Sequence, residues 1–299
     1  MPELGVGGHG EDVRVRSASA LEVSALIDLF NHSYSDYAVP LQLSEAAFRD
    51  HVEVNGVDLD CSQVVLDPVV LDPVPLDPVV LDPVPLAFCL IARRGAAGWV
   101  AGMGTVPEHR RQGAGYRALT AAVTAARAAG CHDIWLEVID SNRAAHELYL
   151  KVGFRDVRDL NVWSLSPSQG ELPISRTVEP EDAHTWIVAN RLVREPWQRA
   201  DEALAVLRAR GARLRGIVIE RGGEVRGAVV LTDEDGTTSV RHIAARDEAV
   251  AADLLLAAGG GQRQVQLANV PVDDPASLAM QRLGADLVAR QHEMRLGRS

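Results

Sequence analysis

The sequence VPEHRRQGAGY, residues 106–116, is the most informative stretch of this chain. It follows residues 98–106, which predict a β-strand, and precedes alanine-rich residues 114–129, which predict a helix closed by Gly130. Gly113 and Gly115 stand at the turn, where a missing side chain lets a ligand approach the backbone. The first amides of a helix have no partner within it, and the helix dipole favours negative charge there. The stretch therefore predicts an anion site suited to a pyrophosphate.

Three arginines, Arg110, Arg111 and Arg117, add positive charge around this turn. Taken alone, however, a Gly-x-Gly pattern is not specific, because it is neither the Gly-x-Gly-x-x-Gly fingerprint nor the P-loop. A plain tight turn beside solvated arginine side chains is then the better interpretation.

The neighbouring sequence changes that interpretation. Arg110-x-x-Gly113-x-Gly115 resembles the acyl-CoA pyrophosphate motif of the GNAT acetyltransferase superfamily, and WLEVIDSNRAAHELYLKVGF, residues 135–154, resembles its second motif. The resemblance covers residues 13–165 by the order of predicted elements, with specific residues only in 98–154. It implies an α/β (α+β) fold with a mixed sheet, in which the fourth and fifth strands splay and the pantetheine arm of acetyl-CoA lies between them.

The resemblance also implies which residues contact acetyl-CoA as the co-substrate. The backbone of Gly104, Thr105 and Val106 would pair with pantetheine, and Asn142 would contact the same arm, although Asn142 is equally suited to cap the next helix. Gly102 and Gly104 fit a bulged strand that a ligand approaches closely. The residues whose amides would hold the pyrophosphate are Arg111, Gln112, Gly113, Ala114, Gly115 and Tyr116.

Tyr149 and Glu137 are the candidate catalytic residues. Tyr149 lies on an apolar stripe of the predicted helix 143–152, so it could be a core residue only, whereas the resemblance implies the general acid that protonates the CoA thiolate. Glu137 lies in the predicted strand 134–139 beside Trp135, where a raised pKa would let it accept the amine's proton through water. The alternative for Glu137 is an exposed residue on the sheet face. The spacing of Glu137, Asn142 and Tyr149 resembles that of ribosomal-protein N-terminal acetyltransferases.

The order of predicted elements recurs after the polar, turn-forming residues 166–172. Aligning Gly153 with Gly284 repeats the helix–Gly–strand pattern, so we predict two GNAT-like domains, a first copy (residues 1–166) and a second copy (residues 173–299). Residues 237–258 of the second copy contain no glycine, and Asp247 and Glu248 stand where a phosphate would lie. The counterparts of Tyr149, Asn142 and Glu137 are Met280, Asp273 and Ala268. We therefore expect the second copy neither to bind CoA nor to catalyse.

A proline-rich pentad repeat, Leu-Asp-Pro-Val with a fifth variable residue, fills residues 66–85. Proline at every fifth position excludes a helix and a central strand. A tandem duplication within a surface loop explains the repeat, and a partner-docking motif is the alternative.

Composition restricts the remaining possibilities. A length of 299 residues suits two domains, and a net charge of -11 argues against a protein that tracks nucleic-acid phosphates. Three cysteines without close pairing exclude a disulfide framework and favour a reducing cytoplasm. Neither a signal peptide nor an apolar run long enough for a membrane span is expected. His109 and His146 are expected to be solvated, and no grouping of His, Asp and Glu has ligand spacing, so no metal is expected.

The expected function is transfer of acetyl from acetyl-CoA directly to a primary amine of a small molecule or a protein N-terminus. None of the three cysteines falls within the matched motifs, which argues against a covalent enzyme intermediate. The alternative is a non-catalytic acyl-CoA-binding or interaction module. The sequence leaves the acceptor open, and it is compatible with a monomer, in which the two copies form a pseudo-dimer, or with a homodimer.

Overall fold

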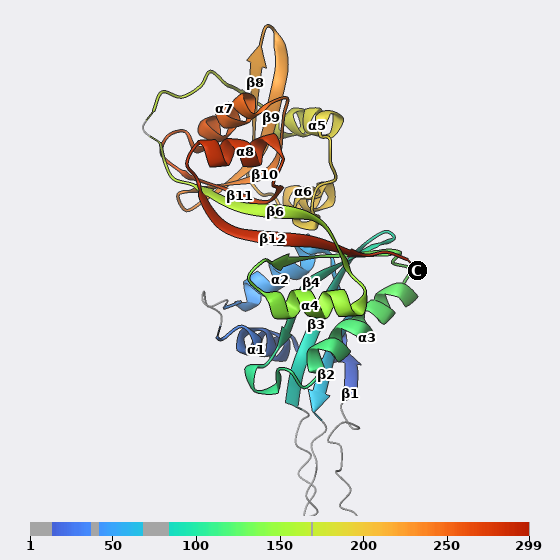
Figure 1. Cartoon of the computed structure of the whole chain (residues 1–299). Helices are drawn as coiled ribbons and strands as arrows, with labels where there is room; N and C mark the ends of the chain where they lie inside the picture. The colour runs from blue at the N-terminus through green and yellow to red at the C-terminus, as the bar shows by residue number, and fades with distance from the viewer. Residues whose placement is uncertain (1–13, 37–41, 68–83, 169, 299) are drawn as a thin grey trace, which may run out of the picture. The chain divides into compact units, whose positions relative to one another are not determined.

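A computed structural model describes residues 14–36, 42–67, 84–168 and 170–298 of the chain (Figure 1). The chain divides into two compact units. The first unit comprises Met1–Leu136, Leu148–Phe154 and Arg295–Ser299, and the second comprises Glu137–Glu147 and Arg155–Met294. The predicted pentad loop 66–85 is wrong at both ends, because residues 66–67 and 84–85 lie in two paired antiparallel strands with Leu66 opposite Pro85, while residues 68–83 lie outside the described residues.

The first unit is a mixed sheet with helices, in the strand order β1-β2-β3-β4-β5. Its neighbouring strands are antiparallel except β4 and β5, which are parallel. The predicted helix 114–129 is found as α3, and Gly130 follows it with a φ of 94°. The elements are β1 (Arg14–Ser17), α1 (Val23–Ser33), α2 (Glu45–Asn55), β2 (Val57–Asp67), β3 (Val84–Arg94), β4 (Ala97–Thr105), α3 (Ala114–Ala128), the start of β5 (Asp133–Ile139) and the end of α4 (Arg143–Val152).

Two features distinguish the edge of β4 on the side of β5. Leu90 pairs with Gly102 and Ile91 with Val100, so Ala101 is the extra residue of a β-bulge, which confirms the predicted bulge beside Gly102. The parallel pairing of β4 with β5 joins residues 97–99 to residues 133–135, whereas β4 runs on to Thr105 and β5 to Ile139. Past Trp99 the edge of β4 is therefore open on the side of β5, as the family resemblance implies.

The second unit repeats this arrangement in the strand order β12-β6-β11-β10-β9-β8-β7. Val240 pairs with Leu231 and His242 with Val230, so Arg241 is a bulge residue in the same register position as Ala101. The parallel pairing of β10 with β11 again joins residues 237–239 to residues 264–266. The elements are β6 (Arg155–Leu165), β7 (Arg176–Val178), α5 (Pro180–Asn190), α6 (Asp201–Ala209), β8 (Leu214–Arg221), β9 (Glu224–Glu234), β10 (Thr237–Ala245), α7 (Glu248–Gly259), β11 (Gln264–Pro271), α8 (Pro275–Arg282) and β12 (Asp286–Leu296).

The last strands of the two copies are exchanged, which the sequence analysis did not predict. β6, the last strand of the first copy, pairs with β11 of the second copy, with Leu165 opposite Val265. β12, the last strand of the second copy, lies between β5 and β6 in the strand order, and its Arg290 carbonyl accepts a hydrogen bond from the Asp140 amide just beyond β5. The compact units therefore do not coincide with the sequence segments 1–166 and 173–299.

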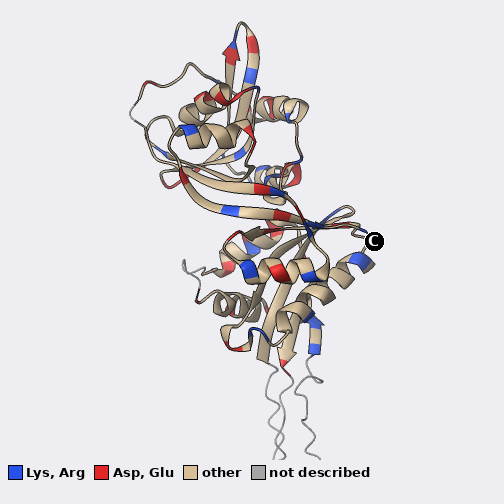
Figure 2. Ribbon diagram, in the orientation of Figure 1, with Lys and Arg blue, Asp and Glu red and all other residues tan. Residues whose placement is uncertain are grey.

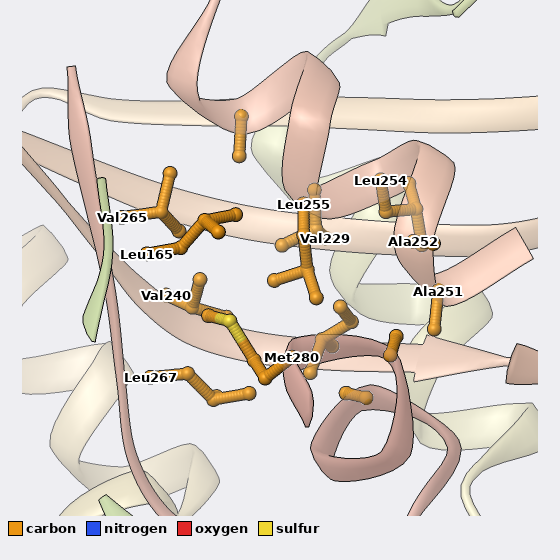
Figure 3. Close-up of a cluster of buried hydrophobic side chains, with 14 of the residues drawn as sticks. Leu165, Val229, Val240, Ala251, Ala252, Leu254, Leu255, Val265, Leu267 and Met280 are labelled. Carbon is orange, nitrogen blue, oxygen red and sulfur yellow. The ribbon is translucent and has the colours of Figure 1, made fainter. Parts of the chain in front are cut away.

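The core of the second unit confirms that β6 belongs to it. Trp163 and Leu165 of β6 are members of one apolar cluster with residues of α7, α8 and β11, and Leu165 lies beside Val265 (Figure 3). Charged residues also lie along β6 and β12 (Figure 2), and Arg158 Nε donates to Glu293 Oε2 at 2.7 Å between these two strands. The burial of Trp163 and Leu165 in this apolar cluster explains why β6 is fixed on the second unit.

Helices in the described ranges are short. The longest, α3, has 15 residues, and none combines the length and the apolar composition that a membrane span requires.

Candidate functional site

The turn between β4 and α3 has the backbone that the sequence predicted. Gly113 is the N-cap of α3 with a φ of 88°, and its position carries no side chain to bond the first helical amides. Arg111 also has a positive φ, 63°, which is uncommon for a residue with a side chain. Residues 111–113 are exposed, so the amide-lined start of α3 is open to solvent. This is the geometry of a helix N-terminal anion site.

Arg110 holds this turn rather than lying free beside it. Its guanidinium donates two hydrogen bonds to Asp36, at 2.6 and 2.8 Å, and a third to the Ser33 carbonyl at 2.9 Å. Its Nε donates to the Thr105 carbonyl at 3.2 Å. The Arg110 guanidinium lowers the pKa of Asp36 below its usual range, chiefly by hydrogen bonding. The arginine of the motif therefore ties the turn to the end of α1.

The start of α3 packs tightly against the end of β4. A Cβ built on Gly115 would lie 2.9 Å from Thr105 Oγ1 and 3.2 Å from Met103 Cε, so this position accepts only glycine without displacement. The same Cβ would lie 3.8 Å from Leu148 of α4. Lys151 of α4 places its Nζ 5.1 Å from the centre of the Tyr116 ring. The phosphate-binding candidate and this part of α4 are therefore neighbours within the first unit.

The backbone N–H and C=O groups of β4 face alternately toward β3 and toward the open edge. The Val106 amide donates to the Leu86 carbonyl at 2.9 Å, so it serves the pairing with β3. Because backbone groups alternate along a strand, those of Thr105 and Met103 point the other way, toward the open edge. The Met103 carbonyl accepts from Tyr34 Oη at 2.7 Å, and the Thr105 carbonyl accepts from Arg110. Of the three residues predicted to pair with pantetheine, Thr105 is thus the one whose backbone faces the open edge.

Gly104 is required by packing rather than by its φ. A Cβ at this position would lie 2.6 Å from both Phe88 Cε1 and Ser33 Cβ, closer than real Cβ contacts. A Cβ on Gly102 would meet its nearest atom, in Phe88, at 3.7 Å, which is ordinary van der Waals contact. The glycine at position 104 therefore brings α1 against β4 beside the open edge.

Tyr149 is buried on the inner face of α4. It is 7% exposed, and its ring packs edge-on against Phe154 with 5.9 Å between the ring centres. The predicted stripe is correct, since Ala145, Leu148 and Val152 are half-buried on the same face. Tyr149 lies in the first unit together with the turn and β4.

Asn142 and Glu137 lie in the second unit. Asn142 Oδ1 accepts from the Ala145 amide at 3.2 Å, so Asn142 caps α4, the helix that carries Tyr149. Glu137 is half-buried on β5, and its Oε1 atom is buried. Glu137 is therefore half-buried rather than an exposed residue on the sheet face, while its catalytic role stays a prediction.

The cysteines are poor nucleophiles in this structure. Cys61, Cys89 and Cys131 are all buried and unlinked. Burial, with a contribution from Asp58, raises the pKa of Cys61 to about 11, and burial also raises the pKa of Cys89. Because the thiolate is the reactive form, the thiols of Cys61 and Cys89 stay unreactive at neutral pH.

The second copy lacks the corresponding anion site. Asp247 is the N-cap of α7, and its carboxylate accepts from the Val250 amide at 2.9 Å. Only residues 246 and 247 separate β10 from α7, whereas residues 106–113 separate β4 from α3. Met280, the counterpart of Tyr149, is fully buried within the apolar cluster (Figure 3). The start of α7 is thus closed by its own side chain, and no hydroxyl replaces that of Tyr149.

The contacts of two groups of histidines were not predicted from the sequence. His146, expected to be solvated, has a side chain 24% exposed that lies 2.8 Å from Asp156, and its ring is 5.0 Å from that of His292. His184, Asp201 and His242 come together in the second unit, although no sequence spacing marks them. Burial, assisted by Arg199, lowers the pKa of His242 to about 3. His109, by contrast, is half-buried in the short turn that precedes Arg110.

Comparison with known proteins agrees with these observations. Residues 69–154 match the Acetyltransferase (GNAT) family. A GCN5-related N-acetyltransferase from Sphaerobacter thermophilus has a TM-score of 0.69 and 19% identity, with 95% of each chain covered. A tandem GNAT protein from the clavulanic acid biosynthesis pathway has a TM-score of 0.62 and 15% identity, covering 96% of this chain and 98% of that one. No curated protein sequence matches this chain.

A putative acetyltransferase from Pyrococcus horikoshii covers 100% of this chain and 93% of its own, with a TM-score of 0.64 and 18% identity. These likenesses show that the chain has the two-domain tandem GNAT fold. The resemblance drawn from the two motifs is confirmed, and the family match supports an acyltransferase function.

Proposed function

We propose, from the GNAT family pattern of residues 69–154 and the tandem GNAT fold of the whole chain, that the first copy transfers acetyl from acetyl-CoA to a primary amine. The observation that carries the proposal is the start of α3. Gly113 leaves the first helical amides without a side-chain cap, beside the exposed residues 111–113 and a strand whose edge is open past Trp99. That combination suits a ligand with a pyrophosphate and an extended arm that pairs like a strand.

The residues present fit acetyl-CoA. The amides of residues 111–116 would hold its pyrophosphate, and Thr105 would pair with its pantetheine arm through the open edge. Gly115 lets the start of α3 pack directly on the end of β4, because a Cβ there would meet Thr105 and Met103, and this places the helix amides beside the strand. Asn142, at the start of α4, would contact the arm in addition to capping the helix.

The reaction needs a base, an acid and a positioned acyl group. Acetyl-CoA supplies an activated thioester when it is bound. Glu137 would accept a proton from the attacking amine through water, and Tyr149 would donate its phenolic proton to the departing thiolate sulfur. The carbon–nitrogen bond forms as the carbon–sulfur bond breaks, so acetyl passes directly to the amine. The raised thiol pKa values support this direct route over one through a cysteine.

The acceptor is a primary amine, either of a small molecule or of a protein N-terminus. The net charge of -11 is compatible with a cationic acceptor. The alternative function is an acyl-CoA-binding or interaction module without catalysis, in which the burial of Tyr149 would reflect core packing only.

Release of free CoA thiol from acetyl-CoA separates the two functions. The full chain is incubated with acetyl-CoA and a panel of polyamines, amino sugars and peptides with free N-termini. Catalysis predicts thiol release that depends on one class of amine and yields its acetylated product. No thiol release with any amine favours the binding module, and release that is the same without any added amine indicates thioester hydrolysis and contradicts transfer to an amine.

A further inference from the structure

The second unit gathers three metal-ligand side chains from three separate elements. His184 lies on α5, Asp201 begins α6, and His242 lies on β10 immediately after the bulge. One ligand atom from each residue can be chosen so that all three lie within 4.8 Å of one another. His184 Nε2 is 2.9 Å from Asp201 Oδ1, and His242 Nδ1 is 3.9 Å from the same oxygen.

His242 requires an explanation that the protein atoms do not provide. Its side chain is 1% exposed, and neither of its ring nitrogens has a hydrogen-bond partner among the described residues. Leaving a buried polar group without a partner destabilises the fold, so such groups usually contact a water or an ion. Its Nδ1 lies 3.9 Å from Asp201 Oδ1, a separation at which both atoms can bind one ion.

From this arrangement we propose that His184, Asp201 and His242 bind a divalent transition-metal ion of the zinc type in the second copy. Two imidazoles and one carboxylate are the donor set that zinc accepts, whereas magnesium and calcium prefer oxygen donors only. In a tetrahedral zinc site with bonds near 2.0–2.2 Å, neighbouring donor atoms lie about 3.4 Å apart. The two measured separations, 2.9 and 3.9 Å, bracket that value, and the remaining pair of donor atoms lies within 4.8 Å, so the side chains would rotate to bring all three donors onto one ion.

Arg191 would act in the second coordination shell. Its Nη1 and Nη2 donate to Asp201 Oδ1 and Oδ2 at 2.9 and 2.7 Å, which fixes the orientation of the carboxylate. The positive charge of Arg191 also offsets part of the ligand charge, and buried Arg199 raises the local potential further. We therefore expect weaker binding than in a closed four-ligand site, with water in the fourth position.

The site would give the second copy a role of its own. Its ligands connect two helices to the bulged strand, so the ion would brace the unit whose anion site is closed by Asp247. His242 stands in the register position of Gly102, where the first copy has no side chain. This inference does not rest on acetyl transfer, and it concerns residues outside the proposed active site.

The experiment titrates Zn²⁺ into the metal-stripped full chain by calorimetry, with Co²⁺ absorption as a spectroscopic probe of the ligands. The proposal predicts one ion per chain, nitrogen- and oxygen-ligated Co²⁺ spectra and a higher melting temperature with Zn²⁺. His184→Gln keeps a hydrogen-bond donor for Asp201 but removes the imidazole, and it should weaken binding at least tenfold, as should Asp201→Asn. Both positions are partly exposed, so these variants are preferable to changes at buried His242.

His132→Ala, which removes an exposed histidine of the first unit, is the matched control and should bind like wild type. Acetyl-CoA affinity should be unchanged in every variant, which keeps this test separate from the proposed function. The proposal is overturned if the stripped wild-type chain takes up no Zn²⁺, or if His184→Gln and Asp201→Asn bind it within about twofold of wild type.

Discussion

Gly113 and Asp247 occupy the same position in the two copies, the N-cap of the helix that follows the bulged strand. They differ in whether a side chain accepts a hydrogen bond from the first amides of that helix. Gly113 leaves the first turn of α3 uncapped, whereas Asp247 accepts a hydrogen bond from Val250 in the first turn of α7. A carboxylate at this place also repels a phosphate. The two copies have therefore kept one fold and the same bulge, but only the first has an open anion site.

The close contact of Gly104 with α1 predicts a sharp difference between two glycines of β4. Gly104→Ala should destabilise the chain by roughly 1–3 kcal/mol, because its Cβ would lie 2.6 Å from Phe88 and Ser33. Gly102→Ala, whose Cβ meets nothing closer than 3.7 Å, is the matched control and should unfold near the wild-type midpoint. Equal midpoints for the two variants in chemical denaturation would show that the contact is not tight.

Tyr149→Phe should separate catalysis from packing. The substitution keeps the ring and its edge-on contact with Phe154 but removes the O–H group. Turnover should fall roughly 10–10⁴-fold at neutral pH, while acetyl-CoA affinity and melting temperature stay near wild type. The loss should shrink with an acyl donor whose thiol is a better leaving group. Turnover within about twofold of wild type would mean that Tyr149 serves only the core.

Glu137→Gln should alter the pH profile of kcat/KM. The amide cannot accept the amine's proton, so the acidic limb should be depressed most, and the defect should ease at high pH where the amine is already deprotonated. Steady-state rates across pH 6–10 measure this effect. A defect that is constant over the whole range would assign Glu137 a structural role instead.

From the contacts of His292 on β12 we predict that the stability of the fold depends on pH. This dependence tests whether charge helps to hold the exchanged strands together. His292 lies 2.8 Å from Asp159 of β6 and 3.1 Å from Asp140 beyond β5, and near His146. Burial alone would lower the pKa of His292, but the hydrogen bonds to Asp159 and Asp140 prevail and hold it above its usual value. A raised folded-state pKa stabilises the fold below the unfolded pKa, and this contribution disappears as pH rises through the folded value.

His292→Asn should therefore lower the melting temperature more at pH 5.5 than at pH 9. His132→Asn, at an exposed position, should show little difference between the two pH values. A His292→Asn loss that is the same at both pH values would indicate that charge plays no part in joining these strands.

Much of the fold follows from local sequence. The helix 143–152 was predicted with the bounds that the structure gives, because Gly153 ends it. The exchange of β6 and β12 was not predictable, since residues 155–165 and 286–296 have similar patterns and either could pair with β5 or β11. That choice is made by tertiary packing, as in the cluster around Leu165.

The site was predictable in part for a related reason. Gly113 and Asn142 act through the backbone close to them in sequence, so local motifs reveal them. For Arg110 the sequence indicates only a positive charge at the turn, because its partner Asp36 is 74 residues away. The cluster of His184, Asp201 and His242 depends entirely on the fold, so no spacing along the chain could reveal it.

Calorimetric titration of the full chain with acetyl-CoA tests the central claim most directly, that one open anion site exists and lies at Gly113. We predict one acetyl-CoA per chain, no detectable binding by Gly113→Asp, and weakened but measurable binding by Gly113→Asn, because both side chains tolerate the φ of 88° and can cap the helix but only Asp adds a negative charge. Two equivalent sites per chain, no binding by wild type, or wild-type affinity in Gly113→Asp would contradict the account.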